Sequence, residues 1–159
     1  MKFSAERAIL LKALAHIQSV AEKRNTIPIL ANVLIQAADG RLSLKATDME
    51  IEVVEHIPAT IKRDGATTVP ASVLYEIVRK LPDSVEVELD QAGSDGPLLL
   101  RADRYSTRLN VLSVDDFPSM GTGDLPCRFK VGAGVLRSLI DRTRFAISTE
   151  ETRYYLNGI

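Results

Sequence analysis

Residues 32–47 read NVLIQAADGRLSLKAT, and this stretch decides the fold of the chain. It contains two runs rich in apolar residues, Asn32 to Ala38 and Arg41 to Thr47, with the pair Asp39-Gly40 between them. A tight hairpin turn needs residues with positive φ, and glycine adopts that conformation without a steric penalty. The stretch therefore predicts two antiparallel strands joined by a two-residue turn.

Segments on both sides of this hairpin show either helical or strand spacing. Apolar residues recur at helical spacing from Glu6 to Ala21 and from Ser72 to Leu81, which predicts two helices, and Ser72 lies close enough to the second start to cap it. Period-two alternation predicts more strands at Met1 to Ala5, Met49 to Ile57, Val85 to Leu89, Leu98 to Arg101 and Tyr105 to Leu112. The chain should therefore form layers of helices and strands.

The pattern of the N-terminus begins again late in the chain. An offset of 126 residues places Phe129 on Phe3. The same offset aligns further apolar positions: Val135 with Ile9, Leu136 with Leu10, Ile140 with Leu14, Tyr155 with Ile29 and Leu156 with Leu30. Both copies have the order strand, helix, polar loop, strand, so we predict an internal duplication whose second copy stops inside its second strand.

Asp115 to Pro126 is rich in proline and glycine, as is typical of a linker. We therefore expect a first domain at residues 1–121, a linker at 122–126 and the beginning of a second domain at 127–159.

The composition excludes several classes of protein. Of the 159 residues, 45% are hydrophobic and the formal net charge is −1, which fits a globular protein. The single cysteine, Cys127, cannot form an internal disulfide and favours a reducing compartment, and we expect it to be a small packed residue. Glu6 and Arg7 interrupt the N-terminal apolar run, and no run has membrane-spanning length. We expect a cytoplasmic protein without a membrane partner.

Charge is unevenly distributed along the chain. The predicted helices are rich in basic residues: Arg7, Lys12, Lys23 and Arg24 in the first helix and its loop, Arg79 and Lys80 in the second, and Arg137, Arg142 and Arg144 in the third. The strand region from Asp83 to Asp103 has six acidic residues against Arg101. Basic helices could face a polyanion, since phosphate attraction is independent of sequence. Ordinary solvated faces explain the same pattern, and charge alone leaves both interpretations open.

Six segments occur in an order that resembles one family, the beta subunits of bacterial DNA polymerase III, or sliding clamps. They are MKF…ER…LLKAL at the start, RNTIPILANVLI at 24–35, LSLKATDMEIE at 42–52, GATTVPA at 65–71, DFP at 116–118 and RYYLNGI at 153–159. The resemblance covers nearly the whole chain. It implies an α+β clamp fold, with helices on the inner face, antiparallel sheets on the outer face and an internal domain repeat.

The same resemblance implies a function. Each clamp subunit has three similar domains, and two subunits close head to tail into a homodimer ring around duplex DNA. The ring is a non-catalytic processivity factor of a DNA-directed DNA polymerase, a nucleotidyltransferase complex. It tethers the catalytic subunit of DNA polymerase III, and an ATP-driven clamp loader opens it. No cofactor and no metal are implied.

Particular residues match family positions. Arg24, Tyr154 and Tyr155 match DNA-contacting residues, and Leu156 matches a leucine of the pocket that binds partner peptides. Ile77, Leu81 and Leu109 match the subunit interface in kind. Three positions depart from the family pattern, namely Ser72, Thr107 and Glu150; Ser72 and Glu150 are therefore not expected to contact DNA.

Two other functions remain as alternatives. Asp48, Glu50 and Glu52 share one predicted strand face and could bind a metal in a nucleic-acid enzyme, although carboxylates at this spacing more often form a solvated face. A shortened clamp-derived module could instead dock on a partner without encircling DNA. We expect the 159-residue chain alone neither to form a ring nor to be held on DNA topologically, because it contains one whole domain and part of another.

Overall fold

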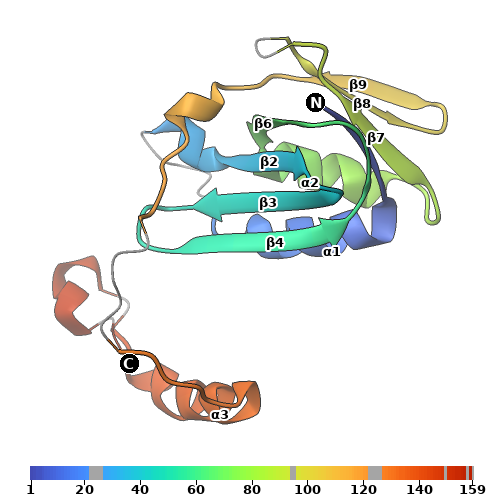
Figure 1. Ribbon diagram of the computed structural model, residues 1–159. Helices are drawn as coiled ribbons and strands as arrows, with labels where there is room; N and C mark the ends of the chain where they lie inside the picture. Colours follow the sequence, from blue (N-terminus) through green and yellow to red (C-terminus); the bar gives the residue numbers. More distant parts are fainter. Residues whose placement is uncertain (22–26, 94–95, 122–126, 149, 157, 159) are drawn as a thin grey trace. The chain divides into compact units, whose positions relative to one another are not determined.

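The computed structural model describes residues 1–21, 27–93, 96–121, 127–148, 150–156 and 158. The chain divides into two compact units, Met1–Met120 and Gly121–Ile159. The first unit contains two sheets and two helices (Figure 1). No helix in these residues is long and apolar enough to cross a membrane.

The predicted hairpin lies at the centre of one sheet of the first unit. Its strands are β2 (Asn32–Ala38) and β3 (Arg41–Thr47), with Ala38 opposite Arg41. Asp39 and Gly40 both have positive φ, at 52° and 71°, as a two-residue hairpin turn requires. The hairpin prediction is therefore confirmed. β4 (Glu52–Pro58) and β6 (Gly65–Pro70) complete the sheet in the order β4-β3-β2-β6.

A second sheet has the order β5-β1-β7-β8-β9. Its strands are β1 (Lys2–Glu6), β5 (Thr60–Arg63), β7 (Glu86–Asp90), β8 (Leu98–Ala102) and β9 (Tyr105–Leu109). Every paired strand in both sheets is antiparallel. The sequence did not predict β5 or β6, because these short strands have few apolar residues at period two. β9 is an edge strand, so its outer backbone groups have no strand beside them among the described residues.

The two helices of this unit, α1 (Arg7–Ile17) and α2 (Ala71–Lys80), pack against each other. Figure 1 shows both on one face of the sheet that contains β2, β3 and β4, where α1 contacts β3 and β4, and α2 contacts β2 and β6. Both helix predictions are confirmed within a few residues. The predicted cap is wrong: Pro70 is the N-cap of α2, and no side chain caps it.

Apolar side chains from both helices and both sheets meet in one core. Its largest fully buried members include Phe3, Leu10, Leu14, Ile17, Ile35, Leu42, Leu44, Leu74, Leu89, Leu98 and Leu100. Burial of each such side chain contributes roughly 1.5–3 kcal/mol to folding. The core thus fixes α1 and α2 relative to the strands and determines which of their faces reaches solvent.

A smaller cluster anchors the chain after β9. Phe117 follows the short helix η2 (Val114–Asp116) and packs on Ile29, Leu30 and Leu34, two of which come from η1 (Pro28–Ala31). The DFP motif therefore belongs to a packed connector.

The second unit contains α3 (Ala133–Thr143), η3 (Arg144–Ala146) and η4 (Glu151–Leu156). Adding the offset of 126 residues to the bounds of α1 gives residues 133–143, the bounds of α3. The strands expected on both sides of α3 are wrong, since residues 128–132 form no strand and 151–156 are helical. β1 is hydrogen-bonded to β5 and β7, and residues 128–132 have no such neighbours in the described part. Cys127 is exposed, not packed.

Candidate nucleic-acid and subunit interfaces

The solvent side of α1 presents part of the basic surface that the sequence predicted. Lys12 is exposed and forms no ion pair with the residues that the structure describes. His16, one turn further along, is exposed, and its Nδ1 lies 2.7 Å from Oε1 of Glu55 on β4. Lys12 is therefore the cation of α1 that is available to an external anion. Arg24 and Lys23 lie outside the described residues.

α2 adds two more cations near its C-terminal end. The guanidinium of Arg79 lies 2.7 Å from Oε2 of Glu76 and 5.9 Å from the centre of the Tyr75 ring. Lys80 is exposed and makes no ion pair within the described ranges. Because α1 and α2 pack together, Lys12 and Lys80 belong to one helical layer.

Arg7 is also one of the basic residues of the first predicted helix, but its side chain is mostly buried. Its side chain is only 14% exposed, and it hydrogen-bonds to carbonyl oxygens of Val78 and Arg79 and to the carboxylate of Asp83. The donors of Arg7 are thus directed at protein groups rather than at solvent.

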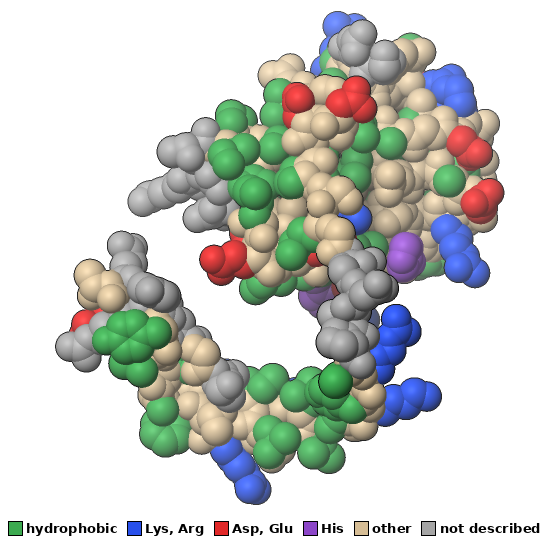
Figure 2. Space-filling model, turned by 60° about the vertical axis from the view of Figure 1, so that its left-hand side comes forward, with side chains coloured by type: hydrophobic (Ala, Val, Ile, Leu, Met, Phe, Trp, Pro, Cys, Tyr) green, Lys and Arg blue, Asp and Glu red, His purple; other side chains and the backbone are tan. Residues whose placement is uncertain are grey.

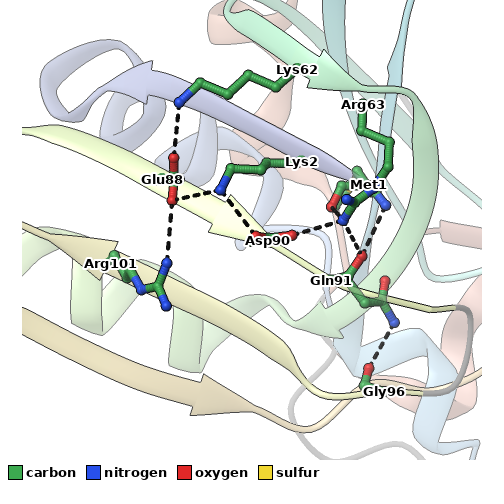
Figure 3. Close-up of polar contacts among 9 residues, drawn as sticks. All are labelled: Met1, Lys2, Lys62, Arg63, Glu88, Asp90, Gln91, Gly96 and Arg101. Carbon is green, nitrogen blue, oxygen red and sulfur yellow. Dashed lines mark hydrogen bonds and ion pairs between the residues drawn. The ribbon is translucent and has the colours of Figure 1, made fainter.

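Two of the three acidic residues of β7, Glu88 and Asp90, form ion pairs within their own sheet (Figure 3). Glu88 lies 3.2 Å from Lys2, 3.1 Å from Lys62 and 3.7 Å from Arg101. Asp90 lies 3.1 Å from Lys2 and 2.8 Å from Arg63, whose guanidinium also donates to the carbonyl oxygens of Met1 and Gln91. Lys2, Lys62, Arg63 and Arg101 are therefore paired with carboxylates of β7, which makes these four cations less available to phosphate.

The pKa values of this network shift in the direction that its contacts require. Hydrogen bonds from Lys62 and Lys2 lower the pKa of Glu88. Partial burial opposes ionisation of Asp90, but Lys2 and Arg63 outweigh it, and the pKa of Asp90 is lowered. Hydrogen bonds to Asp90 and Glu88 raise the pKa of Lys2. These shifts favour the charged forms of Glu88, Asp90 and Lys2, whose ion pairs join β7 to its neighbouring strands.

A hollow of about 430 Å³ lies between α2 and the start of β9. Its lining is mostly apolar and consists of Ser72, Val73, Glu76, Ile77, Lys80, Leu81 and Tyr105. Val73 and Tyr105 are 45% and 43% exposed. An apolar hollow beside an edge strand is a suitable surface for another protein chain.

The predicted interface residues occupy different depths at this hollow. Ile77 is half-buried and lines it, and Leu81 lines it with only 7% of its surface exposed. Leu109 is 5% exposed, belongs to the core and is not among the lining residues. Sequence reasoning missed Val73 and Tyr105, the two most exposed apolar side chains of the lining. The sequence does contain a pattern that indicates this apolar face of α2, because Val73, Ile77 and Leu81 recur every four residues.

The second unit contains the remaining predicted site residues. Tyr155 and Leu156 are exposed in η4, and the backbone of Ser148 donates to the carbonyl oxygen of Leu156 at 3.0 Å. Tyr154 lies in the same helix, and its side chain is outside the described residues. Many apolar side chains of this unit are exposed, including Phe129, Val135, Leu139 and Phe145. Figure 2 shows hydrophobic side chains along the surface of this unit.

The Asp48 carboxylate stabilises a turn, and Glu52 pairs across strands. Oδ1 of Asp48 accepts hydrogen bonds from the backbone N–H groups of Glu50 and Ile51, at 2.9 and 2.7 Å. These two bonds lower the pKa of Asp48. Glu52 pairs with Lys45 on the neighbouring strand at 3.2 Å. Within the described residues no group of three metal-binding side chains occurs.

A family model supports the resemblance of the first unit. The model for the N-terminal domain of the DNA polymerase III beta subunit matches residues 1–121. This range covers both sheets, α1, α2 and the hollow.

Curated relatives and solved structures extend the match. The chain is 54% identical over 159 residues to the beta sliding clamp of Caulobacter vibrioides and 38% identical over 160 residues to that of Escherichia coli. It spans 43% of the length of each, with all of its own residues aligned.

A crystal structure of the Caulobacter crescentus beta sliding clamp aligns with a TM-score of 0.95 at 54% identity, covering 99% of this chain and 42% of that one. The Bartonella birtlesii clamp, solved with griselimycin bound, gives a TM-score of 0.95 at 46% identity, covering 100% and 42%. The predicted α+β clamp fold is therefore confirmed, and the chain belongs to the DNA polymerase III beta subunit family, the bacterial sliding clamps.

Proposed function

We propose that this chain supplies the N-terminal domain and the start of the central domain of a DNA sliding clamp. Two full-length subunits would close into a homodimer ring around duplex DNA, and the ring would tether the replicative polymerase during DNA replication without catalysing a reaction. The observation that carries the proposal is the match of the whole chain to sliding clamps at a TM-score of 0.95.

The distribution of charge in the first unit supports DNA as the ligand. Glu88 and Asp90 of the acidic strand β7 are paired with cations of their own sheet, and Lys12 and Lys80 of the helical layer are exposed and have no ion pair among the described residues. Phosphates would therefore be attracted to the helices, which form the inner layer of the ring. Such contacts read no base sequence, and a sliding protein requires that property.

The proposed DNA contacts at positions that match the family are Arg24, Tyr154 and Tyr155. We add Lys12 to them because its side chain is exposed. A guanidinium can bind phosphate through two hydrogen bonds, and a phenol can donate one. The exposed ring of Tyr155 is consistent with this role.

The hollow between α2 and β9 is the proposed subunit interface. Its half-buried Ile77 and exposed Val73 and Tyr105 would be covered by the second subunit, while Leu81 and Leu109 support them from the core. The open edge of β9 could extend its sheet into the partner by backbone hydrogen bonds.

Other partners follow from the same proposal. Leu156 would form part of a pocket for peptides of the polymerase catalytic subunit and the clamp loader, which opens the ring. We also propose a domain boundary with residues 1–121, 122–126 and 127–159 as first domain, linker and start of the second domain, and a cytoplasmic location.

A primer-extension assay tests this function. Full-length clamp, clamp loader, ATP and the polymerase catalytic subunit are combined on a long primed template, with the polymerase limiting. The proposal predicts products much longer with clamp than without it, and a loss of this gain when the loader is omitted. Equal product lengths with and without clamp would contradict it.

A further inference from the structure

Arg7 directs its whole guanidinium group at the end of α2. Its Nε donates to the carbonyl oxygen of Val78 at 3.1 Å, and one terminal nitrogen donates to that of Arg79 at 2.7 Å. The other terminal nitrogen lies 2.8 Å from Oδ1 of Asp83. The backbone N–H of Arg7 also donates to the carbonyl oxygen of Val85 at 3.0 Å. One residue at the start of α1 thus holds the end of α2 and the loop that follows.

α2 needs these donors because its own sequence caps it poorly. The final carbonyl groups of a helix have no partner inside the helix, and a glycine beyond the end often allows the backbone to supply one. Here the C-cap is Leu81 in an extended conformation, which donates only to Val78, and Pro82 has no N–H. A cation near the C-terminus of a helix is also favoured by the helix dipole.

The turn of α2 that Arg7 holds is also the turn that lines the hollow. Three residues of this turn line the hollow, namely Ile77, Lys80 and Leu81. They flank Val78 and Arg79, whose carbonyl oxygens accept hydrogen bonds from Arg7. A shift in the last turn of α2 would therefore move these side chains away from the position that a second subunit must meet.

We propose that Arg7 is a positioning residue for ring closure: it fixes the last turn of α2 so that the hollow fits the second subunit, and it makes no contact with DNA. This inference rests on the proposed function, because it assigns the hollow to the subunit interface. Lysine cannot replace Arg7 in this role, since one ammonium group cannot match three acceptors held by a planar fork.

The test compares Arg7→Lys, Arg7→Ala and Arg79→Ala in the full-length clamp. Arg79→Ala is the matched control because it removes the same charge from the same end of α2, and among the described residues the Arg79 side chain contacts Glu76 and the Tyr75 ring on α2 itself. Sedimentation equilibrium should give a dimer dissociation constant raised about tenfold or more for both Arg7 variants, as expected for lost charge-assisted hydrogen bonds, and changed less than about threefold for Arg79→Ala.

Two further measurements separate positioning from general destabilisation. Hydrogen exchange of the Leu81 amide, which closes the last turn, should accelerate in both Arg7 variants and not in Leu42→Ala, a core substitution in β3 that lowers Tm. At protein concentrations where the rings are closed, DNA binding by Arg7→Lys should keep the salt dependence of the unsubstituted protein.

An unchanged dimer dissociation constant for Arg7→Lys would overturn the inference. An equal rise of that constant in Arg79→Ala, or an equal acceleration of Leu81 amide exchange in Leu42→Ala, would also overturn it. If Arg7→Ala does not fold, Arg7→Lys decides the matter. An unsubstituted protein that stays monomeric at every concentration would instead contradict the proposed function itself.

Discussion

The hydroxyl group of Thr68 and the backbone of Leu112 form two hydrogen bonds with each other. Oγ1 of Thr68 donates to the carbonyl oxygen of Leu112 at 2.8 Å and accepts from its N–H group at 3.2 Å. The same oxygen accepts from Nδ2 of the buried Asn32 at 3.0 Å. These bonds fasten the chain that leaves β9 to β6, directly before Phe117 enters its cluster.

Thr68→Val should therefore destabilise the first unit. Valine keeps the shape of threonine but leaves the N–H of Leu112 and the amide of Asn32 without their acceptor, at a cost of about 2 kcal/mol in the free energy of unfolding. Urea denaturation followed by circular dichroism measures the difference. The neighbouring Thr67 provides a control, because its buried Oγ1 has no hydrogen-bond partner in the described structure. Thr67→Val should be neutral or stabilising, and equal losses in the two variants would contradict this assignment.

The fold was predictable where local patterns agree with long-range packing. The strands Asn32–Ala38 and Arg41–Thr47 were predicted residue for residue, because alternation and the Asp39-Gly40 turn specify the same structure. β4 begins later than predicted, since Asp48 binds the N–H groups of Glu50 and Ile51 and prolongs the turn. That turn depends on side-chain hydrogen bonds that periodicity does not reveal.

The candidate site was less predictable than the fold. Residue counts assigned the charge of Arg7 to a solvent face, but its position against the end of α2 is a tertiary contact between residues 71 or more apart. The family resemblance assigned Leu81 and Leu109 to the subunit interface, and the structure adds that both side chains are nearly buried within the first unit. Which apolar residues remain exposed, such as Val73 and Tyr105, depends on where α2 lies beside β9.

The ion pairs of Glu88 predict a dependence of stability on pH. The pKa values of Glu88 and Asp90 are lowered in the folded state from ordinary values of 4.5 and 3.8. The stability that these ionised carboxylates add to the folded state is therefore fully present above their unfolded-state pKa values. It is lost as the pH falls through their lower folded-state pKa values. Glu88→Gln should lower stability at pH 7 by about 1 kcal/mol, because these pairs are partly exposed.

The matching measurement is Tm at several pH values between 7 and about 2, in the range over which lowered carboxyl pKa values act. The difference between Glu88→Gln and the unsubstituted chain should shrink toward the acid end. Glu76→Gln is the control, because among the described residues the ion-pair partner of Glu76 is Arg79 on the same helix. A constant difference at all pH values would show that the charge of Glu88 is not the cause.

Asp48 should act through its turn and not through a metal. Asp48→Ala removes the acceptor of two backbone N–H groups and should cost about 1 kcal/mol of unfolding free energy, whereas Asp48→Asn retains an acceptor oxygen and should cost less. Thermal denaturation compares the variants. Addition of Mg²⁺ or Mn²⁺ should leave Tm unchanged for all three proteins. A metal-dependent rise in Tm that Asp48→Ala abolishes would favour the alternative of a metal-dependent enzyme.

Lys12 should contribute one phosphate contact per subunit. In the full-length clamp, Lys12→Ala is expected to weaken binding to duplex DNA and to reduce the slope of log K against log salt by about two, one for each subunit of the ring. Arg24→Ala should have a similar effect. Lys62→Ala is the control. Lys62 pairs with Glu88 on the sheet that contains β5 and β7, so its loss should leave the slope unchanged. Equal slopes for Lys12→Ala and Lys62→Ala would remove Lys12 from the DNA-facing surface.

Topological retention on DNA shows whether the full-length protein encircles the duplex. Full-length clamp is loaded by the clamp loader onto nicked circular DNA, separated from free protein by gel filtration, and the circle is then cut with a restriction enzyme. We expect the clamp to remain with the uncut circles and to be lost from the linear molecules, because a closed ring slides off free ends. Retention on cut DNA equal to that on intact circles would contradict encirclement.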